Sequence, residues 1–251
     1  DTAAAEWTYR ATSTSGEEPY GPSDWSKGYP DCAMNRQSPI NLATDLMTMG
    51  NYSDYGLEFN RVFCRSSELT FQADYAVYFD GCPNVPSLTW EGETYNLLQF
   101  HIHSPSEHLM GYGEHDAEIH MVHVKEGTTD ELLVVGILYD VSQYGNNVGL
   151  ERLWNVLELG GNSTTETFNM AVYDVLPDDP SYSHYMGSLT TPPCTQGVKW
   201  IVMNEVSTMG KGQLEDYREA VASYPGSKVD EFGNTNRPAQ TPNGRDVFYI
   251  A

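Results

Sequence analysis

The sequence predicts a single, mainly β domain in which an antiparallel-rich sheet carries a few peripheral helices. A chain of 251 residues can bury one large core, so we expect residues 1–251 to form one domain. Short apolar and β-branched runs recur between Gly, Pro, Asn or Asp along the chain, which is the pattern of many short strands. Helical periodicity occurs in only two places, so a barrel of alternating βα units is not expected.

The expected strands lie throughout the chain. In two further segments apolar residues recur at helical spacing, and each of these apolar stripes is interpreted as the core-facing side of a peripheral helix. The strand segments are 56–63, 68–72, 75–79, 95–103, 117–124, 132–141, 168–176 and 198–206. The helical stripes are formed by Leu150, Leu153, Trp154 and Leu157 and by Leu214, Tyr217 and Val221. The first 35 and the last 25 residues, rich in Ser, Gly, Pro and Asn, are expected to be long surface segments.

The charge balance excludes some partners. Thirteen Lys and Arg residues against 35 Asp and Glu residues give a formal net charge of -22, spread along the whole chain. Phosphate binding needs the opposite sign, so we expect neither nucleic acid nor an anionic membrane as a partner. The acidic residues are interpreted as a solvated surface, because the chain contains no calcium-binding loop of the D-x-[DN]-x-[DN]-G type.

The cysteines and sequons indicate an oxidising compartment. Four cysteines fit two disulfides, and counting leaves all three pairings open. Asn51 and Asn162 each begin a possible N-glycosylation sequon. No apolar run is long enough to span a membrane. We therefore expect a secreted, periplasmic or luminal protein from which any signal peptide has been removed.

The segment 95–103, "YNLLQFHIH", predicts a strand with one polar face. Alternation places Tyr95, Leu97, Gln99, His101 and His103 on one face and Leu98, Phe100 and Ile102 on the other. An apolar face belongs in the core, so the two histidines are expected to line something polar. Their Cα atoms would lie about 6.7 Å apart, from which two imidazoles can converge on one ion.

A second strand supplies a third imidazole. In "AEIHMVHV", residues Glu118, His120 and Val122 face one way, and Ala117, Ile119, Met121 and His123 face the other. Three neutral imidazoles leave the full +2 charge on zinc and a fourth position for water, whose pKa then falls to roughly 7. This ligand set is typical of catalytic zinc. Gln99 can orient His101, and Glu118 can orient His120.

We assign no metal-binding or catalytic role to the remaining histidines. His108 and His123 are interpreted as hydrogen-bonded structural residues, and His115 and His184 as surface or loop residues.

A cupin-type metal enzyme is the alternative for the same stretch, since His101, His103 and Glu107 satisfy the first part of a cupin motif. Its flanks do not match. Gly113 comes one residue too early, Tyr95 stands where the motif opens on Gly, and the second cupin motif is missing.

Several motifs in order resemble the α-class carbonic anhydrases. They are "RQSPINL" at 36–42, "QFHIHSPSEH" at 99–108, "AEIHMVH" at 117–123, "GSLTTPPC" at 187–194 and "NRPAQ" at 236–240. The resemblance extends from about Trp7 to near the C-terminus. It implies a large, mostly antiparallel twisted sheet of about ten strands with helices outside it. It also implies a zinc enzyme that interconverts CO2 and bicarbonate through attack of zinc-bound hydroxide on CO2.

The resemblance assigns roles to individual residues. It implies that His101, His103 and His120 bind zinc. Thr190 would accept a hydrogen bond from the zinc hydroxide and donate its own proton to Glu107, which orients the nucleophile. The Thr190 N–H and the Thr191 side chain would hold CO2 or bicarbonate. An apolar wall for the uncharged substrate would be formed by Val122, Val134, Leu189 and Trp200.

The resemblance also implies the disulfide Cys32–Cys194, which leaves Cys64–Cys82 as a second pair. Two peptide bonds, Ser38-Pro39 and Pro192-Pro193, fall where the family has cis bonds.

Two features depart from the family pattern. The fastest members pass the product proton through a histidine that precedes the zinc ligands, whereas this chain has no histidine in its first 100 residues. The corresponding region offers Gln72, Ala73, Asp74 and Tyr75, so we expect slower proton transfer that responds to added buffer. The insertion at 10–21 has no function that the sequence indicates.

The second hypothesis is a protein with the same fold but without carbonic anhydrase activity. A non-catalytic acidic extracellular domain, such as a matrix or adhesion module, would share the sheet and the surface charge. Loss of zinc histidines is the usual sign of such a domain, and all three are present here.

Overall fold

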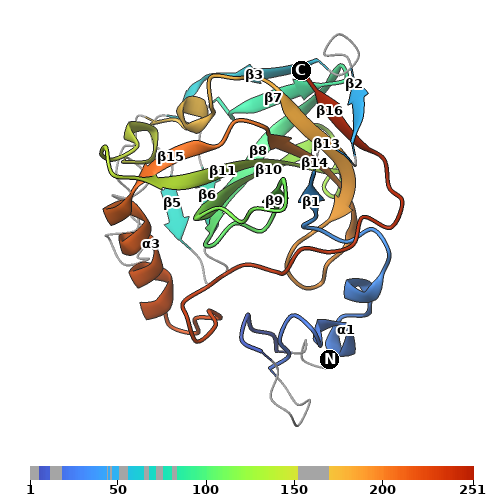
Figure 1. Cartoon of the computed structure of the whole chain (residues 1–251). Coiled ribbons are helices and arrows are strands. Elements are labelled where there is room, and N and C mark those ends of the chain that lie inside the picture. Colours follow the sequence, from blue (N-terminus) through green and yellow to red (C-terminus); the bar gives the residue numbers. More distant parts are fainter. Residues whose placement is uncertain are drawn as a thin grey trace.

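The structure, a computed structural model, describes residues 6–11, 19–43, 45, 47–50, 56–64, 68–71, 76–80, 84–151 and 170–251. Its centre is a 12-stranded curled sheet within these ranges (Figure 1). Along the sheet the order is β2 (Thr48–Gly50), β16 (Val247–Ile250), β13 (Tyr182–Ser188), β14 (Gln196–Met203), β11 (Leu132–Ser142), β10 (Ala117–Lys125), β8 (Glu93–His103), β6 (Ala76–Asp80) and β5 (Glu68–Phe71). The remaining strands of this sheet are β3 (Leu57–Asn60), β7 (Ser87–Trp90) and β15 (Ser207–Gly210).

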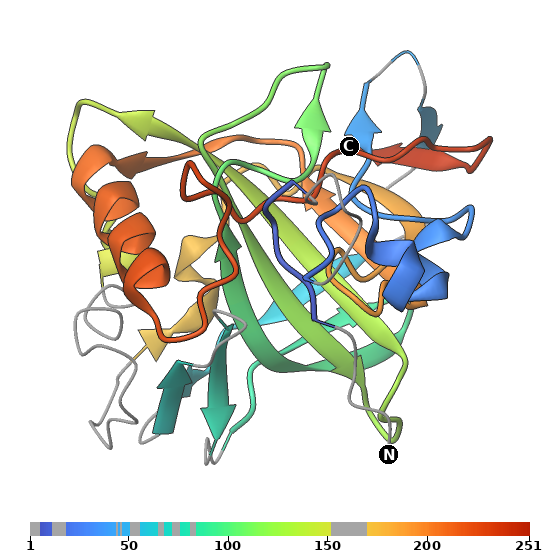
Figure 2. The same cartoon turned by 90° about the horizontal axis from the view of Figure 1, so that it is seen from below.

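Most neighbouring strands are antiparallel, which confirms the predicted fold class. The exceptions in the large sheet are β11, which runs parallel to both β14 and β15, and β16, which runs parallel to β2. Two small pairings lie outside it, between β1 (Asn41–Leu42) and β9 (Leu109–Met110) and between β4 (Phe63–Cys64) and β12 (Met170–Ala171). The helices with both ends described are α1 (Trp25–Gly28), α3 (Lys211–Ser223) and the 3-10 turns Pro30–Ala33 and Val172–Val175, and residues 148–151 form a further helical turn. Helices α3 and α1 lie at opposite sides of the molecule (Figure 2).

The central strands β10 and β11 are buried on both faces, and each face contributes to a different apolar cluster. One cluster, here called the helix-side core, contains Ile119 and Met121 of β10 together with Leu214 and Tyr217 of α3. The other cluster, here called the site-side core, consists of Ile40, Leu42, Val122, Val134, Leu138, Tyr185, Val198, Trp200, Val202 and Val247. The predicted alternation along β10 is therefore present, with Val122 on one face and Ile119 and Met121 on the other.

Strand β8 has a bulge that the sequence pattern did not predict. His123 pairs with Leu97 and Val122 pairs with Gln99, so Leu98 is the extra residue. The bulge shifts the alternation by one position. As a result Tyr95 and Leu97 lie in the helix-side core with Phe100. The expectation that Tyr95 and Leu97 share a face with His101 is wrong for this reason.

The predicted helix at 214–221 is α3, and its three stripe residues are buried in the helix-side core. Leu150, the first residue of the other stripe, lies in a helical turn and is fully buried. The other three residues of that stripe, Leu153, Trp154 and Leu157, lie outside the described residues.

The terminal segments are more structured than expected. Trp7, Tyr9 and Trp25 form edge-to-face ring contacts and pack with the half-cystines Cys32 and Cys194. The last 25 residues include β16, which pairs with β13. Aromatic anchors separated by polar residues lack the periodicity on which sequence reasoning depends.

The segment 168–176 is also different from the prediction, because a 3-10 turn follows two residues of strand.

The disulfide Cys32–Cys194 is present, with the two Cα atoms 4.9 Å apart. The peptide bonds Ser38-Pro39 and Pro192-Pro193 are cis, as is Ser104-Pro105, which the sequence analysis did not single out. The predicted pair Cys64–Cys82 and the sequons at Asn51 and Asn162 fall outside the residues whose side chains are described. None of the described helices has the length and apolar character of a membrane span.

His123 is a buried, hydrogen-bonded histidine, as predicted. It is fully buried on the helix-side face of β10, where its Nε2 lies 3.0 Å from the Tyr173 hydroxyl and the two rings are stacked. Burial lowers the pKa of His123 to about 3. In the unfolded chain the same group binds a proton near pH 6.5.

This difference in proton binding predicts acid-sensitive stability. Between pH 7.5 and pH 5 the unfolded chain gains a proton at this position and the folded protein does not, so folding becomes less favourable. We expect the free energy of unfolding to fall by about 2 kcal/mol more in the wild type than in His123→Phe over this range. Urea unfolding of both proteins at the two pH values measures the difference. Equal losses in the two proteins would contradict the assignment.

Candidate metal centre

Three imidazoles converge at one point between β8 and β10. The antiparallel register pairs His101 directly with His120, and His103 lies two residues further along β8. One ring nitrogen from each histidine lies within 4.8 Å of the others. His101 Nε2 and His120 Nδ1 are 3.3 Å apart. The sequence-predicted ligand set is therefore brought together, and this spacing suits nitrogen ligands about 2 Å from one small ion.

The second ring nitrogen of each histidine faces an oxygen acceptor. His101 Nδ1 lies 2.9 Å from Gln99 Oε1, and His120 Nε2 lies 2.8 Å from Glu118 Oε1. Both pairs were predicted. His103 Nδ1 lies 2.5 Å from the carbonyl oxygen of Thr235. Since each of these nitrogens donates its proton outward, the other nitrogen of each ring presents a lone pair inward.

The partner of His103 was missed by the sequence analysis. Thr235 contributes a backbone carbonyl 132 positions away along the chain. Every residue has a backbone carbonyl, so no residue type or spacing in the sequence could have indicated that this one contacts His103.

Burial keeps the three imidazoles neutral. It lowers the pKa of His103 to about 4 and also lowers the pKa values of His101 and His120. For His101 the neighbouring His103 and His120 add to this effect. Neutral imidazole is the form that binds a metal. His103 Nε2 is also fully buried without a hydrogen-bond partner, which is costly unless another species satisfies its lone pair. The donor set therefore fits a divalent ion such as zinc.

Glu118 is the anionic centre behind the imidazoles. Its side chain is fully buried and accepts four hydrogen bonds. Oε2 accepts from the backbone N–H groups of Glu107 (2.9 Å) and His108 (2.7 Å). Oε1 lies 2.6 Å from His108 Nδ1 and 2.8 Å from His120 Nε2. Burial alone would raise the pKa of Glu118, but His108, His120 and their hydrogen bonds hold it well below its ordinary value.

His108 is hydrogen-bonded inside the protein, as predicted, and it extends the network away from the metal ligands. Its Nε2 lies 2.7 Å from the Tyr185 hydroxyl, which donates to Ser38 Oγ at 2.8 Å. Ser38 Oγ in turn accepts from the backbone N–H of Ser188 at 3.1 Å. Tyr185 and Ser38 were not predicted, because they are 147 positions apart and share no sequence pattern.

Glu107 and Thr190 lie beside the three imidazoles. Glu107 Oε1 accepts a 2.8 Å hydrogen bond from the backbone N–H of Arg237, and its Oε2 lies 3.5 Å from His103 Nε2. Burial raises the pKa of Glu107 to about 7, while His120, a hydrogen bond from Thr190 and the Arg237 N–H act in the opposite direction. Thr190 itself is 5% exposed.

The loop that carries Thr190 is fixed at several points. Thr191, half-buried, closes a turn in which its carbonyl accepts from the Cys194 N–H at 2.8 Å. The Cys32–Cys194 disulfide and a 3.2 Å hydrogen bond from Gln37 Nε2 to the Cys194 carbonyl hold the end of this loop. The loop is therefore tied to the N-terminal segment, as the resemblance implied.

The four residues predicted to form an apolar wall lie in one cluster. Val122, Val134 and Trp200 belong to the site-side core, and Leu189 is packed against it. The Trp200 ring centroid is 4.8 Å from that of His120. A buried apolar surface therefore lies against the ligand imidazoles.

The prediction for His115 agrees with the structure, and the prediction for His184 does not. His115 lies in a loop, with its Nδ1 2.9 Å from Asp140 Oδ1, as expected. His184 is 6% exposed within β13, and its Nδ1 lies 2.8 Å from the Trp200 carbonyl, so its assignment to the surface is wrong. The region of the expected proton-transfer group, Gln72–Tyr75, falls outside the described residues.

Residues 20–251 match the family described as eukaryotic-type carbonic anhydrase. The chain belongs to this carbonic anhydrase family. It is 30% identical to alpha carbonic anhydrase 4 of Arabidopsis thaliana, over 91% of this chain and 82% of that protein. A crystal structure of dioscorin complexed with ascorbate superposes with a TM-score of 0.78 at 31% identity, covering 97% of both chains. The α-carbonic anhydrase of Thermovibrio ammonificans, in complex with the inhibitor sulfanilamide, superposes with a TM-score of 0.73 at 26% identity, covering 97% of this chain and 99% of that one.

Gly136 gives a test of the Glu118 arrangement in this family member. It pairs with His120 across β10 and β11, and a Cβ added there would lie 2.9 Å from Glu118 Oε1 and 3.4 Å from a Val202 methyl carbon. Because four hydrogen bonds hold the Glu118 carboxylate, it can make room for an added methyl group only by losing some of them. We expect Gly136→Ala to displace it and to weaken zinc affinity by about 10–100-fold.

Competition with a chromogenic chelator measures that affinity. Gly212→Ala is the matched control, since Gly212 lies in α3 and a Cβ there meets no atom within 4 Å. Equal affinity in Gly136→Ala and the wild type would show that Glu118 does not determine zinc binding.

Proposed function

We propose that this carbonic anhydrase family member is a zinc enzyme that catalyses the reversible hydration of carbon dioxide to bicarbonate and a proton. The observation that carries the proposal is the convergence of His101, His103 and His120 as neutral imidazoles, each anchored through its second nitrogen. Three nitrogen ligands from the protein are the pattern of catalytic zinc sites, whereas structural sites use four protein ligands.

Zinc held by these three residues would supply a Lewis acid that lowers the pKa of a water molecule to roughly 7 and so provides a nucleophile near neutral pH. The chain's own groups then orient the reactants. Glu107 is fixed by the Arg237 N–H, so its carboxylate can accept a hydrogen bond from the Thr190 hydroxyl. Thr190 Oγ1 is then left to accept a hydrogen bond from the nucleophile, which aims a lone pair at the substrate carbon.

The substrate side of the proposal rests on the apolar cluster. Carbon dioxide is uncharged and needs no ion partner, so a wall of Val122, Val134, Leu189 and Trp200 suits it. The Thr190 N–H and Thr191 are the polar groups that we assign to CO2 or bicarbonate. Glu107 and Thr190 are buried, and hydrogen bonds are stronger in such a low-dielectric environment, which favours a fixed orientation of the reactants.

The proposed compartment follows from the disulfide. Cys32–Cys194 joins segments 162 positions apart, and such bonds persist in oxidising environments. We infer a secreted, periplasmic or luminal enzyme.

A non-catalytic binding domain is the second candidate. It is supported by the similarity to proteins named dioscorin, one of which was solved with ascorbate. Some relatives of this chain are therefore not named carbonic anhydrase. Catalysis has to be measured directly.

The test combines zinc content with CO2 hydration on the same samples. We expect stoichiometric zinc and hydration activity in the wild type, and loss of most of the zinc and nearly all of the activity in His120→Ala, because two imidazoles and water hold zinc much less tightly. His115→Ala is the matched control, since His115 lies in a loop beside Asp140. Zinc without hydration in the wild type would favour the binding domain. Bound iron or manganese in place of zinc would contradict the proposed zinc chemistry, and the family match already excludes the cupin alternative.

A further inference from the structure

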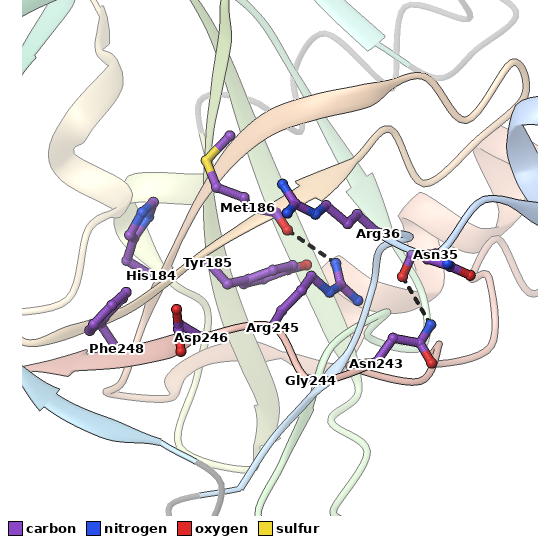
Figure 3. A pocket seen from close by; sticks show the side chains of 10 residues that line it. All are labelled: Asn35, Arg36, His184, Tyr185, Met186, Asn243, Gly244, Arg245, Asp246 and Phe248. Carbon is purple, nitrogen blue, oxygen red and sulfur yellow. Dashed lines mark hydrogen bonds between the residues drawn. The ribbon is translucent and has the colours of Figure 1, made fainter.

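A cavity separate from the candidate metal centre lies between β13, the segment before β16 and the chain at 35–36 (Figure 3). Its volume is about 420 Å³, and none of the three clustered histidines lines it. Tyr185 forms part of its wall and stacks on Trp200, which separates the cavity from the ligand imidazoles. The cavity is large enough for a small organic molecule.

One guanidinium in this cavity is rigidly fixed. Arg245 donates four hydrogen bonds to backbone carbonyls, from Nε to Pro242 (2.8 Å), from Nη1 to Met186 (3.1 Å) and from Nη2 to Gln37 (2.8 Å) and Thr241 (3.2 Å). All four acceptors are neutral, so the positive charge is held in place without being cancelled. A guanidinium has five N–H groups, so one remains for a ligand.

A second guanidinium lies beside the first. Arg36 is exposed, and within the part of the chain that the structure describes it has no hydrogen-bond or ion-pair partner. Figure 3 shows the two side chains entering the pocket from different parts of the chain, Arg36 from the segment at 35–36 and Arg245 from the segment before β16. Burial lowers the pKa of Arg245, and the nearby positive charge of Arg36 lowers it further.

This pairing is unusual for a chain with a net charge of -22 and only 13 basic residues. Two like charges side by side repel each other, and 35 acidic residues were available to neutralise them. One carboxylate, that of Asp246, lines the same pocket, but within the described residues it forms no ion pair with either arginine. The part of the pocket that Arg36 and Arg245 line is therefore suited to an external anion.

The walls limit the kind of anion. Met186 and Phe248 add apolar surface to the pocket, and Phe248 lies beside His184 on the far side of Asp246 from Arg245. The Asp246 carboxylate would repel a second negative group on the ligand. Guanidinium groups bind carboxylates with charge-assisted and often bidentate hydrogen bonds.

We infer that this pocket binds small organic monocarboxylates, with the carboxylate held by Arg36 and Arg245 and the apolar part against Met186 and Phe248. None of the three clustered histidines lines this site, so ligand binding here does not require the proposed zinc chemistry.

Benzoate is the probe, and benzamide is its neutral counterpart of the same shape. Titration calorimetry on the purified protein as isolated should detect benzoate binding and little or no benzamide binding. Arg36→Gln should weaken benzoate affinity by at least about tenfold, since a hydrogen-bonded charge is lost. Arg36 is exposed, so the variant is expected to fold normally. The matched control is Arg61→Gln, which removes the same charge from another exposed position.

A carboxylate could also bind at the metal centre, and His120→Ala separates the two sites. Unchanged benzoate affinity in His120→Ala and in Arg61→Gln, with loss in Arg36→Gln, would support the pocket. Loss in His120→Ala with retention in Arg36→Gln would overturn the inference, because binding would then occur at the metal. Equal loss in Arg61→Gln and Arg36→Gln would also overturn it, since only net charge would matter. Tighter binding of inorganic phosphate than of benzoate would contradict the monocarboxylate class.

Discussion

The antiparallel pairing of β8 with β10 sets the geometry on which the site depends. It places His101 opposite His120 and His103 opposite Glu118, so that two strands bring three imidazoles and one carboxylate to a single point. The bulge at Leu98 is part of this arrangement. It turns Tyr95 and Leu97 into the helix-side core while Gln99, His101 and His103 keep the polar face. A shift of register by one residue would move the histidines into the apolar core.

Glu118 then connects the ligand histidines to distant parts of the chain. Its carboxylate is buried, and it remains ionised because two imidazole groups and two backbone N–H groups hold it. From His108 the hydrogen bonds continue through Tyr185 to Ser38 and the N–H of Ser188, two residues before Thr190. The ligand cluster and the Thr190 loop therefore belong to one buried polar network. Removing one member of such a network leaves other buried polar groups unsatisfied, which is costly.

Much of this site could be predicted from local sequence patterns, and the rest could not. Strand alternation alone indicated His101, His103 and His120, and it also indicated Gln99 and Glu118 as their partners, because residues two apart share a face. Thr190 and Glu107 required the family resemblance, since a threonine in a loop carries no distinctive pattern. The Thr235 carbonyl and the Tyr185 and Ser38 hydroxyls were missed because their contacts span at least 77 positions. Of the fold, the strand-rich class and α3 followed from periodicity. The aromatic N-terminal cluster and β16 did not, because tertiary contacts rather than local patterns determine them.

The central claim is that three imidazole nitrogens bind one zinc ion and leave a position for solvent. X-ray absorption at the zinc edge of the purified protein tests it most directly. The account predicts about three nitrogen neighbours with imidazole scattering at about 2.0–2.1 Å and one additional oxygen neighbour that is not from a histidine. Sulfur neighbours, a fourth imidazole or fewer than three imidazoles would contradict it.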